Sequence, residues 1–240
     1  MDAGADDRFA LLRKYETAAN SAVVRRYFAA DKFDDLANTG KLFFSPASKM
    51  ADKEEGYFTR ADQRARELQL SGFTGREMNI ARQAWDSVSA GNAKAVVLSC
   101  WSLGEDETRK LWSEYGQSEE AVAIETTVAG LREALGSGFL YVPVQYVDRD
   151  TRLLPTDHSL EPFFFKDHEY EWERELRVVG EMEIGRRLCT PRRVAIDSHA
   201  QVFTFVTAPG APRTRYEEVH ARMQARFSRS RLRASSVCAA

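Results

Sequence analysis

The feature that most constrains the fold is a change of hydrophobic period near residue 95. Before it, apolar residues recur mostly at three- and four-residue spacings, which predicts helices over 20–38, 60–70 and 76–88. Residues 95–99 (AVVLS) instead form a continuous apolar run that is typical of a buried strand. Helical segments mixed with strands, without strict alternation, favour an α+β fold. We expect a mostly antiparallel mixed sheet flanked by helices.

Further strands and helices are expected along the rest of the chain. The expected strands cover residues 41–45, 121–126, 139–147, 176–182, 193–197 and 201–207. The expected helices cover residues 105–115, 128–135 and 214–227. A length of 240 residues suits one domain, 1–210, followed by a basic helix and tail, 211–240.

Composition argues against several protein classes. The three cysteines (Cys100, Cys189 and Cys238) show no CxxC spacing, which argues against a disulfide scaffold or a zinc finger and suits a reducing cytosol. No apolar run approaches the roughly 18 residues of a membrane span. The acidic start, MDAGADDRF, lacks the apolar stretch of a signal peptide. We therefore expect a cytoplasmic protein that does not contact a membrane.

The net charge of −2 is a sum over two unlike parts. Residues 211–240 carry a net charge of +5, from seven arginines and two glutamates, and residues 1–210 carry −7. A basic tail can contact phosphate or nucleic acid. It can equally form a solvated basic helix or dock on the acidic body.

The most informative stretch is residues 166–179 (KDHEYEWERELRVV). Its glutamates occupy every second position from Glu169 to Glu175, so an extended chain would place them on one face, followed by Arg177. Neighbouring carboxylates repel one another. The row therefore indicates a partner such as arginine, a metal or a polarised substrate, or else a solvated acidic face.

Two further stretches carry polar or aromatic residues in suggestive places. Residues 96–102 (VVLSCWS) end a buried run with small polar groups, and open-sheet active sites often lie at such ends. Trp112 and Tyr115 follow and would share a helix face, as binding or core aromatics. Residues 41–56 form a strand, a turn and an acidic loop, which is a second candidate site or a surface loop.

Taken in order, these motifs resemble the family known as domain of unknown function 2971, whose members are bacterial and phage-associated proteins. The resemblance spans residues 12–180. The matching residues, in chain order, are Lys14, Tyr15, Leu42, Phe43, Phe44, Ser45, Pro46, Asp52, Glu55, Ser99, Trp112, Ser113, Tyr115, Lys166, Tyr170, Trp172, Glu173, Glu175 and Arg177.

The chain departs from the family pattern at three places. Ala51 and Lys53 stand where the family has asparagine and proline beside the loop acid. Trp101 replaces the second serine of a Ser-x-Ser element, and Tyr170 replaces a tryptophan. If the loop asparagine binds substrate in relatives, this chain has lost or replaced that contact.

The order of these motifs is similar to the three-part site of ADP-ribosyltransferases, which suggests NAD as the cofactor. The phage association of the family that the chain resembles suggests phage defence as a setting. Such enzymes hold NAD with an early basic residue, brace the pocket with a serine-bearing strand and use a late glutamate. The analogy gives Glu175 the charge-stabilising role, with Glu173 as its partner. It also gives cofactor contacts to Lys14, Tyr15, Ser99 and Arg177, and substrate contacts to Asp52, Glu55, Trp112, Tyr115 and Lys166.

Two other hypotheses fit the same residues. In a Mg²⁺-dependent nuclease or phosphodiesterase, Asp52, Glu55, Glu173 and Glu175 would gather the metal, and the basic tail would bring nucleic acid. In a binding or regulatory module without chemistry, the segment from Glu173 to Arg177 would be an internal ion-pair network. For the transferase, a protein or a nucleic acid would be the acceptor, and we expect no metal ligands.

Overall fold

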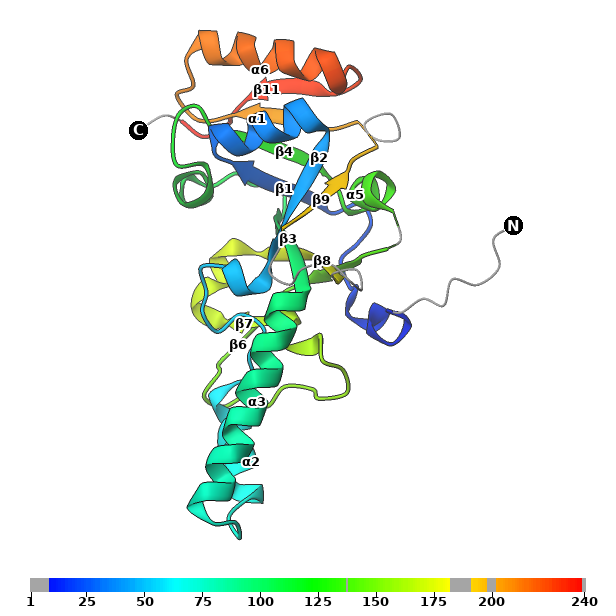
Figure 1. Ribbon diagram of the computed structural model, residues 1–240. Coiled ribbons are helices and arrows are strands. Elements are labelled where there is room, and N and C mark those ends of the chain that lie inside the picture. Colours follow the sequence, from blue (N-terminus) through cyan, green and yellow to red (C-terminus); the bar gives the residue numbers. More distant parts are fainter. Residues whose placement is uncertain (1–8, 137, 182–190, 198–201, 239–240) are drawn as a thin grey trace, which may run out of the picture.

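The computed structural model describes residues 9–136, 138–181, 191–197 and 202–238. Within them the chain is α+β, as expected, with a mixed and mostly antiparallel sheet (Figure 1). The strands are β1 (Val23–Phe28), β2 (Lys41–Pro46), β3 (Val96–Leu103), β4 (Val122–Thr127), β5 (Leu140–Pro143), β6 (Gln145–Val147), β7 (Phe165–Asp167), β8 (Glu175–Glu181), β9 (Arg192–Ala195), β10 (Thr204–Thr207) and β11 (Arg231–Ala234).

Helices and single turns connect and cover these strands. The α-helices are α1 (Ala30–Thr39), α2 (Arg60–Gln69), α3 (Gly75–Ala95), α4 (Arg109–Leu111), α5 (Val128–Leu135) and α6 (Arg213–Arg226). The other turns are η1 (Ala10–Tyr15), η2 (Ala47–Lys49), the π-helical η3 (Trp112–Gly116), η4 (Glu161–Phe164) and η5 (His168–Glu173). No helix in this described part is long and apolar enough to cross a membrane.

The main sheet divides at β3. Its strand order is β11-β10-β4-β1-β3-β2-β9, and β8 with β5 joins at β3 as well. One edge of β3 pairs with β8 from Val96 to Ser102. The other edge pairs first with β2, at Val97 and Leu98, and then with β1, at Ser102 and Leu103. The register therefore opens a gap between β1 and β2 alongside the middle of β3.

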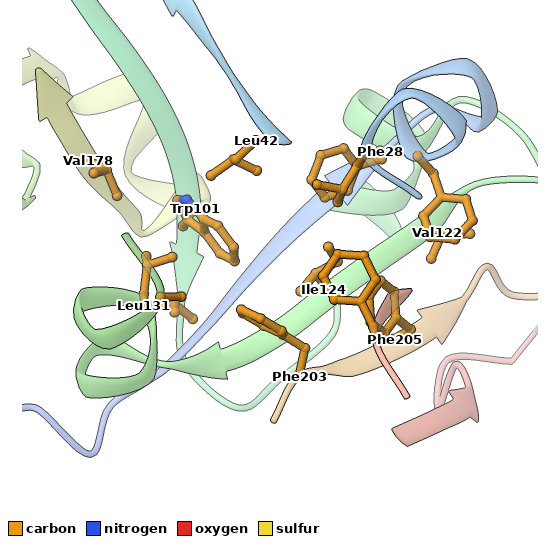
Figure 2. Packing of buried hydrophobic residues seen from close by; sticks show 14 of the residues in the cluster. Phe28, Leu42, Trp101, Val122, Ile124, Leu131, Val178, Phe203 and Phe205 are labelled. Atoms are coloured by element: carbon orange, nitrogen blue, oxygen red, sulfur yellow. The ribbon is translucent and has the colours of Figure 1, made fainter. Parts of the chain in front are cut away.

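The largest buried cluster packs the sheet against α1, α5 and α6. Trp101 of β3, Phe28 of β1 and Phe205 of β10 meet in it, with Leu131 of α5 on its flank (Figure 2). Each of these side chains is at most 5% exposed. Burial on this scale holds the strands on both sides of the gap in a fixed relation, because well-packed cores resist deformation.

The expectation of one helix over residues 20–38 is wrong in its first half. Residues 23–28 form β1, which lies between β3 and β4, and the helix begins only at Ala30. The apolar spacing of VVRRYF fits either state, but its β-branched and aromatic residues favour a strand. Pairing with β4 along its full length then decides the conformation.

The alternating glutamates do not form a continuous strand. Residues from His168 to Glu173 form η5, and β8 starts at Glu175. Arg174 between them takes the left-handed conformation, with φ of 46°. Hence Glu169 and Glu171 are exposed while Glu173 and Glu175 are buried.

The single strand expected over residues 139–147 is two strands: β5 pairs with β8 in the main sheet, whereas β6 pairs with β7 in a separate two-stranded sheet. The helix expected over residues 105–115 is the short α4 followed by the π-helical η3. The remaining expected strands and helices correspond to described elements with shifted ends; Met182 and Gln201, expected strand ends, lie outside the described residues.

The basic C-terminal segment docks on the acidic body. Helix α6 packs through Val219 and Met223 into the main cluster, and β11 extends the sheet beside β10. Arg233 bonds the carboxylates of Glu107 and Glu125. These contacts match the docking alternative for residues 211–240, and they make the segment part of the same folded unit.

Helices α2 and α3 form a hairpin that projects away from the sheet (Figure 1). Each begins with a capping box, in which Thr59 pairs with Asp62 and Thr74 with Glu77. Large apolar side chains on this hairpin are exposed, among them Leu68 at 74% and Val88 at 61%. The capping boxes therefore mark the starts of both helices in the sequence itself.

Candidate active site

A pocket of about 220 Å³ lies at the gap in the sheet. Its floor includes Leu98, Cys100 and Ser102 of β3, which share one face because successive strand residues alternate. Arg26 of β1 and Ser45 of β2 line its sides. We call it the glutamate pocket, because two buried carboxylates, Glu173 and Glu175, form one wall.

Glu173 is held by three residues that also line the pocket: Tyr115, Lys166 and Ser102. Its Oε1 accepts a hydrogen bond from the Tyr115 hydroxyl at 2.8 Å, and its Oε2 lies 2.6 Å from Lys166 Nζ. The Glu173 backbone carbonyl accepts from the Ser102 hydroxyl at 3.0 Å. These contacts come from three separate elements and hold a negative charge at the pocket surface.

Glu175 is held by Arg177 beneath the same wall. Arg177 Nε and Nη2 donate to the two carboxylate oxygens of Glu175 at 2.9 and 3.1 Å, and Lys166 Nζ lies 3.6 Å away. Arg177 also forms a two-bond pair with Glu55, and its Nη1 donates to the Phe163 carbonyl at 2.7 Å. Arg177 is fully buried, so it neutralises two carboxylates out of contact with water.

The buried groups differ in their acidity. Burial alone would raise the pKa of Glu175, but Arg177 and Lys166 outweigh it and lower that pKa to about 2. Burial raises the pKa of Glu55 to about 7 despite Arg177. Burial and the adjacent Glu173 raise the pKa of the Tyr115 hydroxyl, and burial followed by Glu175 raises the pKa of the Cys100 thiol. Tyr115 and Cys100 are therefore neutral at pH 7, and Glu175 is ionised.

The opposite side of the pocket carries arginine. Arg26 Nη1 donates to the Ser99 hydroxyl at 2.5 Å and to the Phe43 carbonyl at 3.0 Å, and no carboxylate of the described chain lies within ion-pair distance. Burial lowers the pKa of Arg26 to about 10, which leaves it charged at pH 7. Its neighbour Arg25 is instead bound by Glu125 and by the carbonyls of Glu105 and Asp106. Arg26 is thus the arginine available to an anionic ligand.

Unusual backbone geometry surrounds the pocket. Tyr115 lies in the π-helical turn η3, and Gln117 directly after it is left-handed, with φ of 66°. Arg174, between the two pocket glutamates, is the other non-glycine residue of the described chain with positive φ. π-turns and such backbone strain concentrate at functional sites, where the surrounding structure enforces them.

The predicted site residues fall into three groups. Glu173, Glu175, Tyr115 and Lys166 line the glutamate pocket together. Arg177 and Glu55 lie behind its wall, and Ser99 lies on the opposite face of β3, where it accepts from Arg26 and from Trp101 Nε1. The remaining four residues do not line this pocket: Lys14, Tyr15, Asp52 and Trp112.

The four outlying residues have local structural partners. Lys14 and Tyr15 belong to the turn η1 rather than to a strand, and the Tyr15 hydroxyl donates to Glu161 at 2.6 Å. Asp52 accepts from the Glu54 backbone N–H at 2.8 Å in the loop. Trp112 packs edge-to-face on Tyr27 in a buried cluster. The expectation that Lys14 or Tyr15 shares a cleft with Glu175 is therefore wrong.

The carboxylates expected to gather Mg²⁺ are engaged by other protein groups. Glu55, Glu173 and Glu175 are each bonded to arginine or lysine, and Asp52 closes a loop. Among the described residues, no group of three or more His, Cys, Asp or Glu side chains is arranged to hold a metal ion. The ion-pair network of the non-catalytic hypothesis does exist, but three of its members, Lys166, Glu173 and Glu175, line a pocket.

Sequence reasoning missed Arg26, the basic residue on the side of the pocket opposite Glu173. On the helix expected over residues 20–38, Arg25 and Arg26 would be ordinary surface charges. The signal that could have identified Arg26 is the β-branched and aromatic composition of residues 23–28, which favours a strand with an arginine on each face.

No family model, curated protein or solved structure matches this chain. The resemblance to domain of unknown function 2971 therefore depends on the ordered motifs alone.

Proposed function

We propose that the protein is an ADP-ribosyltransferase-like enzyme that cleaves the nicotinamide–ribose bond of NAD. The observation that carries the proposal is the arrangement across the gap in the sheet. Arg26, bonded to Ser99, lies on one side, and Glu173, bonded to Tyr115 and Lys166, lies on the other. This supplies the early basic residue, the serine strand and the late glutamate that the motif order suggested, with Arg26 in place of Lys14.

The chemistry fits a fixed carboxylate. Breaking the nicotinamide–ribose bond develops positive charge on the sugar, and a preorganised negative group stabilises that charge. Glu173 suits this role because its partners themselves line the pocket, whereas both oxygens of Glu175 are bonded to the buried Arg177. We therefore propose Glu173 as the catalytic residue and Glu175 as a positioning residue. The Arg26 guanidinium would hold a phosphate of NAD.

The test is nicotinamide release from NAD by purified protein, followed by chromatography, with and without a bacterial extract as the source of acceptor. We expect Glu173→Gln to lower the rate on the order of 10²-fold or more, because the charge is removed while the side-chain shape is kept. Glu171→Gln is the matched control, because Glu171 is an exposed glutamate of the same segment. Thermal unfolding of both variants checks that they fold.

Two outcomes would contradict the proposal. One is nicotinamide release by the native protein that is no faster than in buffer, with the extract present. The other is equal rates for Glu173→Gln and the native chain.

A further inference from the structure

A separate pocket of about 140 Å³ lies in the projecting hairpin of α2 and α3 (Figure 1). Its lining comes from both helices and from Tyr57 and Phe58, which precede α2. We call it the hairpin pocket, and it shares no lining residue with the glutamate pocket. Pockets that enclose a whole small molecule measure about 300–1,000 Å³, so the hairpin pocket suits the end of a single side chain.

Arg66 of α2 is the central cation of this pocket. Its guanidinium carbon lies 3.9 Å from the centre of the Phe58 ring and 5.2 Å from the centre of the Trp85 ring. An arginine that stacks on aromatic rings uses the flat faces of its guanidinium group and keeps the N–H edges free. The rings therefore restrict the orientation of the Arg66 guanidinium and leave its donors accessible.

Arg66 has no acidic partner among the described residues. None of their carboxylates lies within ion-pair distance of its guanidinium, which forms no hydrogen bond with them. Asp62, one turn earlier, accepts instead from the Thr59 backbone N–H and hydroxyl, at 2.9 and 2.7 Å. Glu67 pairs with Arg82 at 2.8 Å. Burial lowers the pKa of Arg66, and no bonded carboxylate offsets that loss of hydration.

The remaining acid in the lining does not cancel the charge of Arg66. It is Asp86, which is exposed, so water screens its field more than that of the partly buried Arg66. An unpaired guanidinium edge fits a planar carboxylate, because two parallel N–H···O bonds form at once. The hairpin pocket therefore favours a carboxylate ligand.

The surface of the hairpin indicates a protein as the source of that carboxylate. The hairpin carries four of the eight large apolar side chains that are exposed in the described chain: Leu68, Phe73, Ile80 and Val88. Exposed apolar surface gathered on one projecting element is typical of a protein–protein contact. We propose that the hairpin pocket receives an aspartate or glutamate side chain of a partner protein, with Arg66 as its anchor. This site does not depend on the proposed reaction.

The experiment is an NMR titration of the full chain, read at the Arg66 Nε–H and the Trp85 indole N–H. The probe is an acetylated and amidated peptide, Ala-Leu-Glu-Leu-Ala, whose leucines suit the exposed apolar side chains of the hairpin. The matched peptide has glutamine in place of glutamate, and acetate and inorganic phosphate are the small-molecule arms. We expect the glutamate peptide to shift both resonances to saturation, the glutamine peptide to shift neither, and acetate and phosphate to bind more weakly than the glutamate peptide.

Gln63→Glu is the decisive variant, because it supplies a carboxylate to Arg66 from the chain itself. Gln63 lines the pocket three residues before Arg66, on the same helix face. The variant should keep or raise thermal stability and should weaken binding of the glutamate peptide by about tenfold or more. Arg66→Lys should also weaken it, because lysine keeps the charge but lacks the planar fork. Gln69→Glu, the same change at an exposed position outside the pocket, should leave binding unchanged.

Any of three results would overturn this assignment. The first is a glutamate peptide that shifts neither resonance, or a glutamine peptide that shifts them equally. The second is a Gln63→Glu variant that binds the glutamate peptide as the native chain does. The third is acetate or phosphate that saturates the site at a lower concentration than the peptide, which would reassign the pocket to a small anion.

Discussion

The buried charge cluster behind the glutamate pocket should make stability fall as the pH rises from about 4.5 to 7. Glu55, Glu173 and Glu175 are at most 6% exposed, and the cations bonded to them are Arg177 and Lys166. Three carboxylates against two cations leave one negative charge in excess within a buried site. A proton on Glu55 would remove that excess.

The magnitude follows from the pKa of Glu55. Its folded pKa is about 7 and its reference value is 4.5, so the folded state binds the proton more tightly between these limits. Stability then declines as pH rises through this window, because the unfolded chain releases the proton first. A difference of about 2.5 pKa units corresponds to about 3 kcal/mol. This contribution is present below pH 4.5 and is lost above pH 7.

The assay is urea denaturation of the native chain and of Glu55→Gln at pH 5, 6, 7 and 8. The amide that replaces the carboxyl group in this variant is neutral throughout, so the variant should lack this decline. The free energies of unfolding of the two proteins should therefore diverge by about 3 kcal/mol as pH rises. Glu119→Gln, at an exposed position, should follow the native curve. Parallel pH profiles for the native chain and Glu55→Gln would refute the argument that the cluster carries one excess charge.

Two substitutions test the packing behind the pocket by thermal and urea denaturation. Arg177→Met should destabilise the protein by about 3–5 kcal/mol, because it leaves buried carboxylates without their main cation. Arg193→Met is the control: it removes an exposed ion pair with Asp35 and should cost about 0–1 kcal/mol. Equal losses in the two variants would show that burial of the ion pair is unimportant. Gly56→Ala should cost about 2 kcal/mol or more, because Gly56 has φ of +76° and a Cβ there would lie 2.0 Å from the Phe163 ring. Gly72→Ala is the control, because a Cβ added at Gly72 has no atom within 4 Å. If Gly56→Ala were as stable as the native chain, the predicted clash with Phe163 and the strain at φ of +76° would be refuted.

Much of the fold follows from local patterns in the sequence. The apolar runs at 96–99 and 121–126 form buried strands, since few other structures bury every side chain of a short run. Helices α2 and α3 carry their own capping residues, so the sequence itself marks where each of them begins. The conformation of residues 23–28 (VVRRYF) is the main wrong prediction, because the spacing of their apolar residues fits a helix and a strand equally well. The β-branched and aromatic composition of this segment favours the strand, and pairing with β4 along its full length fixes it.

The residues of the candidate site likewise divide into those that the sequence predicts and those that only the tertiary structure brings together. The sequence by itself placed Glu173 and Glu175 in the most distinctive motif. The resemblance grouped Tyr115 and Lys166 with them, but in one set with four residues that do not line the pocket. Tertiary structure decided which basic residue faces them, because the gap between β1 and β2 depends on how three strands share the two edges of β3. It also decided that Arg177 binds two carboxylates from segments more than 100 residues apart in the chain. Such contacts depend on which strands pair with which, and local periodicity carries no information about that.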